Sequence, residues 1–342
     1  MNTPLVIERN VSLRNLNTFG IDAKASALLH VTNAVQLAAV RNDPELSAMP
    51  RLVLGGGSNI LLTGDFAGLV LQMETRGIAV TGDDEDATYV RAAAGENWHQ
   101  FVLWTLNQGL AGLENLALIP GCVGAAPVQN IGAYGAEVKD TLHSLTAFDF
   151  DTGNVRMFMN ADCAFNYRDS IFKRTFRNRM VILDVTFALP KRWQPNATYA
   201  DLAQELAARG IASPSAHDIS EAVIAVRTRK LPDPTVFGNA GSFFKNPIVS
   251  AKQLKNLAAR FPQLVSYPQA DGSHKLAAGW LVDQAGWKGK TSGAAGVSET
   301  QALVLVNRGG ASGQDIAQLA QAIQTDVATK FGVKLEPEPL IL

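Results

Sequence analysis

Cysteine, metal-binding histidine patterns and charge bias are all scarce in this sequence, and each shortage excludes a class of protein. The two cysteines, Cys122 and Cys163, lie in no C-x-x-C or His-flanked spacing, so neither a disulfide framework nor a zinc site is indicated. The five histidines make no H-x-x-x-H spacing, which leaves metal catalysis without support. With a formal net charge of -1 and no run of five like charges, the chain is not expected to bind nucleic acid or a membrane surface.

Long apolar runs are also missing. No apolar stretch reaches the roughly 18 residues that span a membrane, and the beginning, MNTPLVIERN, lacks the apolar core of a signal peptide. We therefore expect a cytoplasmic protein. A chain of 342 residues with 47% hydrophobic residues can still bury more than one core, so two or three domains are expected.

Three familiar active-site motifs are absent as well. The turn Gly55-Gly56-Gly57-Ser58-Asn59 does not fit the dinucleotide fingerprint GxGxxG, and an apolar run rather than a helix pattern follows it, so a Rossmann domain is not expected. Residues 286–291, GWKGKT, follow a helical pattern where a P-loop needs a strand. Lys288 and Lys290 remain candidate anion contacts or solvated surface lysines. No serine lies in G-x-S-x-G.

What the chain does contain is a glycine-rich stretch with almost no charge. Residues 112–135, GLENLALIPGCVGAAPVQNIGAYG, hold five glycines, two prolines and one charged residue, Glu114. Glycines without Cβ atoms and prolines with a fixed φ can hold consecutive N–H groups toward a ligand, and such a cradle suits a pyrophosphate. The alternative is a buried connection in which the glycines allow protein segments to pack closely. Residues 51–62, RLVLGGGSNILL, predict a second close-approach turn between two strands.

The remaining pattern is that of an α+β protein in two main parts. Strands are expected at 28–31, 52–54, 68–72, 78–81, 88–93, 142–149, 154–159, 180–188 and 302–306. Helices are expected at 33–41, 97–108, 217–229, 250–260, 276–285 and 312–330, with Gly109 after the second of them and a hairpin at Asp151-Thr152-Gly153. The pattern loosens at 191–216, which predicts a boundary.

Two side chains stand out as candidates for chemistry. Arg168 lies among aromatic and charged residues in 165–173, FNYRDSIFK, a composition that can seat a guanidinium on a carboxylate. The alternative is an ion pair with Asp169. Ser242, in 238–247, GNAGSFFKNP, is a candidate proton donor, and the alternative there is a serine that caps a local backbone group.

Seven motifs in order resemble the UDP-N-acetylenolpyruvoylglucosamine reductase family, which makes UDP-N-acetylmuramate for peptidoglycan. They are NTFG at 17–20, GGGSN at 55–59, ENLALIPGCVGAAPVQNIGAYG at 114–135, YRDSIFK at 167–173, KLPDP at 230–234, NAGSFFKNP at 239–247 and LEPE at 335–338. The resemblance implies an α+β FAD-binding domain of the vanillyl-alcohol-oxidase type and a smaller α/β substrate-binding domain. It implies that residues 1–190 form the FAD-binding domain, in two subdomains split near 65–70, and that residues 217–330 form the substrate-binding domain. Residues 191–216 would be a hinge and tyrosine loop, and residues 331–342 a C-terminal segment that returns to the active site.

The same resemblance assigns roles to residues. Arg168 would stabilise the enediolate, Ser242 would donate the proton, and Glu338 would complete the catalytic site. The substrate would contact Tyr199 in the mobile loop of one subclass, and also Tyr134, Lys230, Asn246, Lys288 and Gln301. FAD would be held without a covalent link by Gly55, Gly56, Gly57, Ser58, Asn59, Pro120, Gly121, Gly124, Ala125, Ala126, Gln129, Ile131, Gly132 and Arg227.

The implied reaction has two halves: NADPH reduces FAD, which then passes a hydride to the enolpyruvyl ether of UDP-N-acetylglucosamine enolpyruvate. A monomer is expected. Two departures stand out: Ala125 and Ala126 replace residues that are often polar, and only Pro339, Leu340, Ile341 and Leu342 follow Glu338. The competing interpretations are a non-catalytic FAD- or nucleotide-binding module and an oxygen-using oxidase of the same fold.

Overall fold

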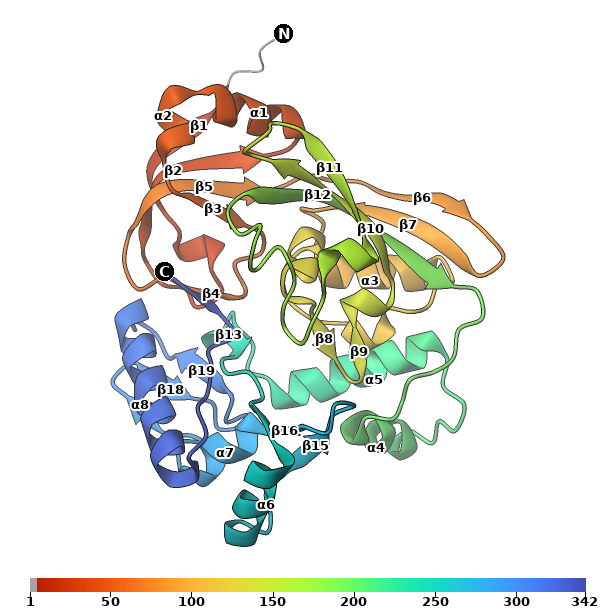
Figure 1. Ribbon diagram of the computed structural model, residues 1–342, viewed down its shortest axis with the longest axis vertical. Coiled ribbons are helices and arrows are strands. Elements are labelled where there is room, and N and C mark those ends of the chain that lie inside the picture. The colour runs from red at the N-terminus through yellow and green to blue at the C-terminus, as the bar shows by residue number, and fades with distance from the viewer. Residues whose placement is uncertain (1–4) are drawn as a thin grey trace. The chain divides into compact units, whose positions relative to one another are not determined.

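The computed structural model describes residues 5–342, which form two compact units (Figure 1). Unit 1 comprises the described residues up to Val11, together with Ala25–Gly57 and Ala67–Arg229. Unit 2 comprises Ser12–Lys24, Ser58–Phe66 and Lys230–Leu342. Each unit is therefore assembled from segments that are distant in sequence.

Unit 1 contains two sheets. The first is small, and two helices are inserted between its strands in the chain. Its strands, in spatial order, are β1 (Ile7–Ser12), β2 (Lys24–Val31), β5 (Phe66–Met73) and β3 (Arg51–Leu54), with β3 parallel to β5. Helices α1 (Ala34–Asn42) and α2 (Pro44–Ala48) lie between β2 and β3 in the chain. An Asn33–Gln36 capping box starts α1, which confirms the helix expected there. The sequence pattern did not predict α2 or β1.

The second sheet of unit 1 is antiparallel. Its spatial order is β11 (Val155–Met159), β10 (Leu142–Asp149), β12 (Met180–Pro190), β7 (Ala87–Ala93) and β6 (Ile78–Asp83). The predicted hairpin is confirmed, because Phe148 pairs with Val155 and Gly153 takes a φ of 76° in the turn. The chain passes from the first sheet to the second after Met73, whereas the sequence suggested a split near 65–70. All of that range from Phe66 onward lies in β5, which pairs with β3.

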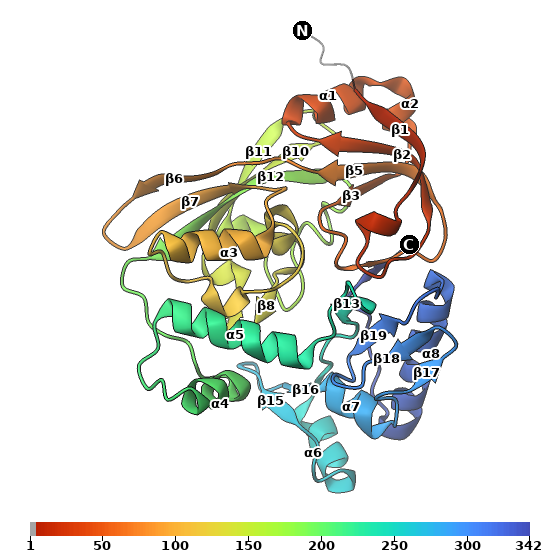
Figure 2. The same cartoon turned by 180° about the vertical axis from the view of Figure 1, so that it is seen from behind.

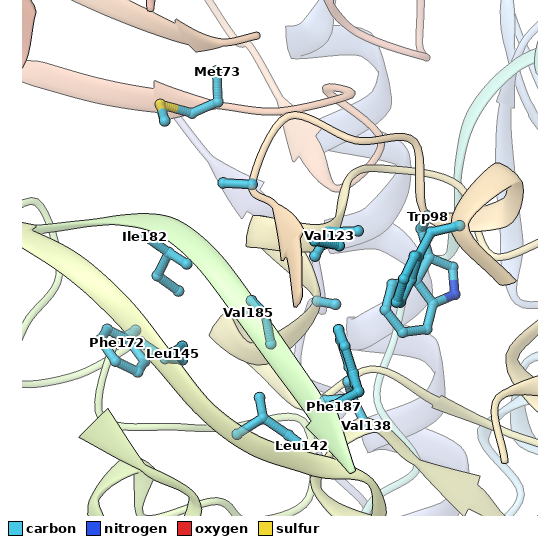
Figure 3. Close-up of a cluster of buried hydrophobic side chains, with 14 of the residues drawn as sticks. Met73, Trp98, Val123, Val138, Leu142, Leu145, Phe172, Ile182, Val185 and Phe187 are labelled. Carbon is cyan, nitrogen blue, oxygen red and sulfur yellow. The ribbon is translucent and has the colours of Figure 1, made fainter. Parts of the chain in front are cut away.

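One core lies between this sheet and helix α3 (Trp98–Asn107). Figure 3 shows Trp98 of α3 and Val185 and Phe187 of β12 directed into one cluster with Val123 of the glycine-rich stretch. The Asn97 side chain caps α3, and Gly109, with a φ of 74°, follows its C-cap as predicted. Ala117 and Val123 are fully buried and anchor the glycine-rich stretch, which is therefore a structured part of the core's edge.

Helices α4 (Ala200–Ala208) and α5 (Ala216–Lys230) also pack on the core of unit 1. Figure 2 shows α5 next to α3, and the His217 ring reaches the Leu106 carbonyl oxygen at the end of α3 over 3.2 Å. The division of the chain therefore differs from the expected hinge at 191–216 and second domain from 217. The physical reason is that Leu202, Ile219 and Val223 bury their side chains in the core of unit 1.

Unit 2 is a smaller α/β assembly. Its main sheet has the antiparallel order β13 (Gly238–Ser242), β19 (Val304–Asn307), β18 (Ala295–Val297) and β17 (Thr291–Ser292). A second antiparallel sheet has the order β14 (Ile248–Val249), β16 (His274–Leu276) and β15 (Ser266–Pro268). A parallel pair joins β4 (Ile60–Leu61) to β20 (Leu340–Ile341). The chain's last residues are thus a strand of unit 2.

Unit 2 contains the helices α6 (Ala251–Arg260), α7 (Ala278–Gln284) and α8 (Gly313–Phe331). Helix α8 lies along β18 and β19 (Figure 1), begins with a Ser312–Asp315 capping box and ends at Gly332, with a φ of 68°. All three helices were expected from the sequence, although Leu276 belongs to β16 rather than to α7. In the part of the chain that the structure describes, no helix is long and apolar enough to cross a membrane, and no group of acidic, histidine and cysteine residues could hold a metal ion.

Candidate active site

The first glycine-rich turn, residues 55–59, packs through its glycines in unit 1 against the second glycine-rich turn, residues 120–132. A Cβ on Gly55 would lie 2.2 Å from the Cys122 sulfur, and a Cβ on Gly56 would lie 2.9 Å from the Gly121 Cα. Both distances are far below a van der Waals contact, so only glycine fits at 55 and 56 without movement of the loop. At these positions glycine lets protein segments approach each other, which was the alternative interpretation of the sequence.

Several N–H groups of the second turn are also used within unit 1. Gly124 donates to the Ala94 carbonyl over 2.9 Å and Ala125 to that of Cys122 over 3.1 Å. Ile131 donates to Ala126 over 3.1 Å, and the Ala126 side chain is buried in the core. The expected row of N–H groups directed at a ligand is therefore wrong for Gly124, Ala125 and Ile131. These backbone bonds hold the turn in shape.

Cys122 lies at the centre of this contact. It is buried, and burial raises the pKa of its thiol despite hydrogen bonds from the backbone of Ala125, Gly56 and Gly124. Because the thiolate is the reactive form, a buried thiol with a raised pKa is a poor nucleophile. Cys122 is thus a packing residue between the two turns.

Five buried side-chain polar atoms of unit 1 have no hydrogen-bond partner among residues 5–342, and two of them are Nε of Arg227 and Oε1 of Gln72. The Gln72 amide nitrogen donates to the Gly55 carbonyl over 2.9 Å, which places this residue at the first turn. Burial lowers the pKa of Arg227, the direction expected for a cation that has left water without full compensation. Such atoms are ready to bind an external polar group, and an anion suits Arg227.

Arg168 is fixed by the same stretch of chain. Its Nη2 donates to the Gly132 carbonyl over 2.7 Å, and a Cβ on Gly132 would lie 3.1 Å from its Nη1. The turn that carries Arg168 is closed by two backbone hydrogen bonds between Asn166 and Asp169, and Asp169 pairs with Arg174 at 3.2 Å. Arg168 has a φ of 53°, a strained value of the kind that clusters at functional sites.

Tyr134 and Tyr199 meet edge to face, with ring centroids 5.3 Å apart. Tyr134 also has a left-handed φ of 48°, and burial raises the pKa of its hydroxyl, with the positive charge of Arg227 acting in the opposite direction. Tyr199 is 42% exposed and occupies the N-cap position of α4. Unit 1 thus brings together two of the predicted substrate contacts and one of the predicted FAD contacts.

In unit 2, Ser242 and Glu338 lie on neighbouring extended segments. The backbone N–H of Glu338 donates to the Phe243 carbonyl over 2.8 Å, and that of Lys245 donates to the Glu336 carbonyl over 2.9 Å. Phe243 and Phe244 are buried and anchor this segment, whereas Ser242 is exposed. Among the described residues the Ser242 hydroxyl caps no backbone group, so the alternative of a capping serine is not supported.

The Asn59 end of the first turn joins the same group in unit 2. Its carbonyl accepts the Leu340 N–H over 3.0 Å, and its amide nitrogen lies 3.5 Å from the Glu338 carbonyl oxygen. Thr63 then bonds to Leu342 through both its N–H, over 2.7 Å, and its hydroxyl, over 2.5 Å. The short tail after Glu338 is therefore docked within unit 2.

Three other predicted substrate contacts lie near the start of α7. The Asn246 side chain accepts from the Ala278 N–H over 2.9 Å, and the Gln301 Oε1 would lie 3.2 Å from a Cβ on Gly279. Thr300, beside Gln301, donates to the Lys230 carbonyl over 2.9 Å. Lys288 is exposed in the segment that follows α7. The structure thus groups Lys230, Asn246 and Gln301 and does not tie Lys288 to them.

Comparison with known proteins identifies the chain. A family profile described as the C-terminal domain of UDP-N-acetylenolpyruvoylglucosamine reductase matches residues 233–342, and an FAD binding domain profile matches 25–158. A UDP-N-acetylenolpyruvoylglucosamine reductase of Burkholderia vietnamiensis is 57% identical, over 99% of this chain and 98% of its own length. One of Paraburkholderia xenovorans is 59% identical, over 96% of each chain.

The chain belongs to the UDP-N-acetylenolpyruvoylglucosamine reductase family. The crystal structure of the reductase from Thermus caldophilus has a similar fold, with a TM-score of 0.69 at 22% identity and 99% coverage of both chains. The resemblance drawn from the seven motifs is confirmed, and so is the α+β fold with an FAD-binding domain.

The sequence did not single out the polar side chains that shape the glycine-rich stretch of this reductase family member. The Asn115 amide donates to the carbonyls of Tyr134 and Asn196, over 2.9 and 2.8 Å. Asn130, fully buried with a φ of 48°, donates to the Glu137 carboxylate over 2.9 Å and to the Asn166 carbonyl over 3.2 Å. For Asn130 the Asn-Ile-Gly sequence at 130–132 offered one signal, since asparagine tolerates a left-handed φ better than most residues.

Proposed function

We propose that this protein reduces UDP-N-acetylglucosamine enolpyruvate to UDP-N-acetylmuramate, with FAD as cofactor and NADPH as the electron donor. Family membership supports the reductase activity, and the FAD-binding domain match supports the cofactor. The structural observation that carries the residue assignment is the hydrogen bond from Glu338 to Phe243, which sets two predicted catalytic residues on adjacent segments.

The residues of unit 1 fit a dinucleotide. The buried, unpartnered Nε of Arg227 suits an anionic group, and the unpartnered Oε1 of Gln72 suits a hydroxyl or amide donor beside the first turn. In this proposal the turns at 55–59 and 120–132 hold FAD without a covalent bond. When bound, FAD accepts a hydride from NADPH and delivers one to the substrate.

In this proposal Arg168 binds the substrate carboxylate and stabilises its negative charge. Hydride addition at the methylene carbon of the enolpyruvyl ether places negative charge on the carboxylate, as an enediolate. A preorganised guanidinium stabilises such charge by a few kcal/mol, roughly the worth of one oxyanion donor. The bond from Arg168 to the Gly132 carbonyl and the strained turn around it provide that preorganisation.

Ser242 then donates its hydroxyl proton to the carbon that bears the ether oxygen, and Glu338 completes the catalytic group. An exposed hydroxyl at the end of β13 suits this role, because the buried Phe243 and Phe244 fix the backbone next to it. Lys230, Asn246, Lys288 and Gln301 are proposed to bind the substrate, together with Tyr134 and Tyr199. We also infer that the protein acts as a cytoplasmic monomer, and sedimentation of the purified protein tests the oligomeric state.

The test is anaerobic and uses the flavin colour. Addition of NADPH bleaches the absorbance of bound FAD, and subsequent addition of UDP-N-acetylglucosamine enolpyruvate restores it with formation of UDP-N-acetylmuramate. A non-catalytic flavoprotein shows neither change, and an oxidase regains colour rapidly with dioxygen alone. Acid precipitation of the same sample releases the flavin into the supernatant; flavin that stays in the pellet contradicts the non-covalent site.

A further inference from the structure

Residues at the N-terminal end of α3 hold the second glycine-rich turn in place through hydrogen bonds. The Trp98 indole Nε1 donates to the Leu116 carbonyl over 2.9 Å, and the Trp98 backbone N–H donates to the Gly121 carbonyl over 3.1 Å. The Glu96 carbonyl accepts the Val123 N–H over 2.9 Å. The path of the chain from Leu116 to Val123 is therefore set by residues at the start of this helix.

His99 supplies the side-chain contact between these points. Its Nδ1 lies 3.0 Å from the Leu118 backbone nitrogen, and Leu118 has a left-handed φ of 57°. A backbone N–H can only donate, so Nδ1 must be the unprotonated ring nitrogen and the proton of the neutral ring lies on Nε2. The bond holds a strained residue directly ahead of the Ile119-Pro120-Gly121 segment of the FAD turn.

The surroundings of His99 favour this neutral form. The ring is half-buried, and burial lowers its pKa from the ordinary 6.5, with the Arg227 guanidinium of α5 as the second cause. On the other side, the ring faces the backbone N–H of Leu118, which carries no charge. Both causes act against the imidazolium, so the acceptor at Nδ1 persists at neutral pH.

We propose that His99 is a positioning residue for FAD: its neutral ring holds Leu118, and through it the Pro120-Gly121 turn, in the conformation that binds the cofactor. Protonation turns Nδ1 into a donor, removes the bond to Leu118 and releases the turn. This inference relies on FAD being bound by unit 1, as in the proposed function, but not on the reduction of any substrate.

The expected pH dependence follows from the direction of the shift. A histidine whose pKa is lowered in the folded protein stays neutral above 6.5 in both folded and unfolded chains. Its contribution is complete there and is lost as pH falls below that value and through the lowered pKa. Because only the neutral ring holds Leu118, FAD affinity should be constant near pH 8 and weaken as pH falls through the lowered pKa of His99.

The experiment measures the FAD dissociation constant of the full-length flavoprotein between pH 5 and 8, by ultrafiltration and fluorescence of the released flavin. His99→Asn is the conservative variant, since its side-chain oxygen can replace Nδ1 as acceptor and does not titrate. We expect it to retain the wild-type affinity of pH 8 and to lose the pH dependence. His99→Leu should bind FAD about tenfold more weakly than wild type at pH 8, the usual effect of losing one hydrogen bond, and should show no pH dependence.

His217→Asn is the matched control, because His217 contacts α3 at its other end, through Leu106. It should keep the wild-type pH dependence. Amide hydrogen exchange at Leu118 gives a second readout, with protection retained in His99→Asn and lost in His99→Leu. The inference is overturned if the pH dependence persists in His99→Asn, or if His99→Leu leaves both FAD affinity and Leu118 protection unchanged. Wild-type protein that gives the expected FAD results but does not reduce UDP-N-acetylglucosamine enolpyruvate would instead contradict the proposed function.

Discussion

The backbone N–H of Glu338 donates to the carbonyl oxygen of Phe243 over 2.8 Å. Since Phe243 directly follows Ser242, this single bond connects the end of the chain to the strand that carries the proposed proton donor. The parallel pair of Leu340 with Ile60 and Ile341 with Leu61 continues the attachment. The position of Glu338 thus depends on residues on both sides of it.

Deleting residues 339–342 should therefore impair substrate reduction more than flavin reduction. The deletion removes the β20–β4 pair and the bonds from Thr63 to Leu342, so Glu338 loses its anchor on the C-terminal side. We expect it to resemble Glu338→Gln, with FAD bound, reduction by NADPH largely kept and transfer to the UDP-sugar slowed, as measured by anaerobic single-turnover absorbance.

Ile341→Ala is the control for this deletion, because the Ile341 side chain is 40% exposed and its backbone pairing is retained. It should behave as wild type. If the deletion leaves turnover intact while Glu338→Gln abolishes it, the tail has no positioning role; if Glu338→Gln is harmless, Glu338 is not a catalytic residue.

Tyr199→Ala should weaken binding of the UDP-sugar by roughly tenfold, the scale of one aromatic contact together with its buried area. The edge-to-face contact with Tyr134 shows that the Tyr199 ring has a defined place in unit 1. NADPH affinity should change less. Titration calorimetry with each ligand separates the two effects, with the exposed Tyr267→Ala as control. Equal affinity of the variant and wild type for the UDP-sugar would remove Tyr199 from the site.

Asp149→Asn should lower the free energy of unfolding at neutral pH by on the order of 2 kcal/mol, since it leaves Arg179 without its main partner. The two side chains form paired hydrogen bonds of 2.9 and 2.8 Å, and the Asp149 side chain is fully buried. Arg179 is the main cause that lowers the pKa of Asp149 from 3.8 to about 2.

The pH dependence of this contribution has a definite sign. A carboxyl group with a lowered folded-state pKa stabilises the protein above its unfolded value, here 3.8, and the stabilisation disappears as pH falls toward about 2. Denaturant unfolding at pH 7 and pH 3 should show a smaller difference between wild type and Asp149→Asn at the lower pH. Asp86→Asn, in an exposed pair with Arg192, should change little at either pH. A difference in the free energy of unfolding between wild type and Asp149→Asn that is larger at pH 3 than at pH 7 would be inconsistent with this explanation.

Elements with local signals were predictable from the sequence. The Asn97 cap and Gly109 delimit α3, the Asp151-Thr152-Gly153 turn fixes a hairpin, and Ser312 and Gly332 bracket α8. The signal lies within a few residues of each feature, so no tertiary information is needed. The catalytic candidates came from motif resemblance in the same way.

Features that depend on distant segments were not predictable. Nothing near Gly55 in the sequence indicates that the Cys122 sulfur fills the space beside it, or that β4 pairs with β20 at the chain's end. The contact of His99 with Leu118 was missed for a related reason: a lone histidine on a helix carries no pattern. Helix α5 was placed in the wrong part because its Ile219 and Val223 could equally face either core.

The central claim is that Ser242 acts only in the second half of the reaction, as proton donor. Anaerobic stopped-flow of Ser242→Ala tests it directly, with Ser292→Ala, an exposed strand serine of the same unit, as control. We predict flavin reduction by NADPH near the wild-type rate, and reoxidation by the UDP-sugar slower by roughly 10² or more, the typical contribution of a positioned acid. Equal losses in both half-reactions, or normal reoxidation, would contradict the account.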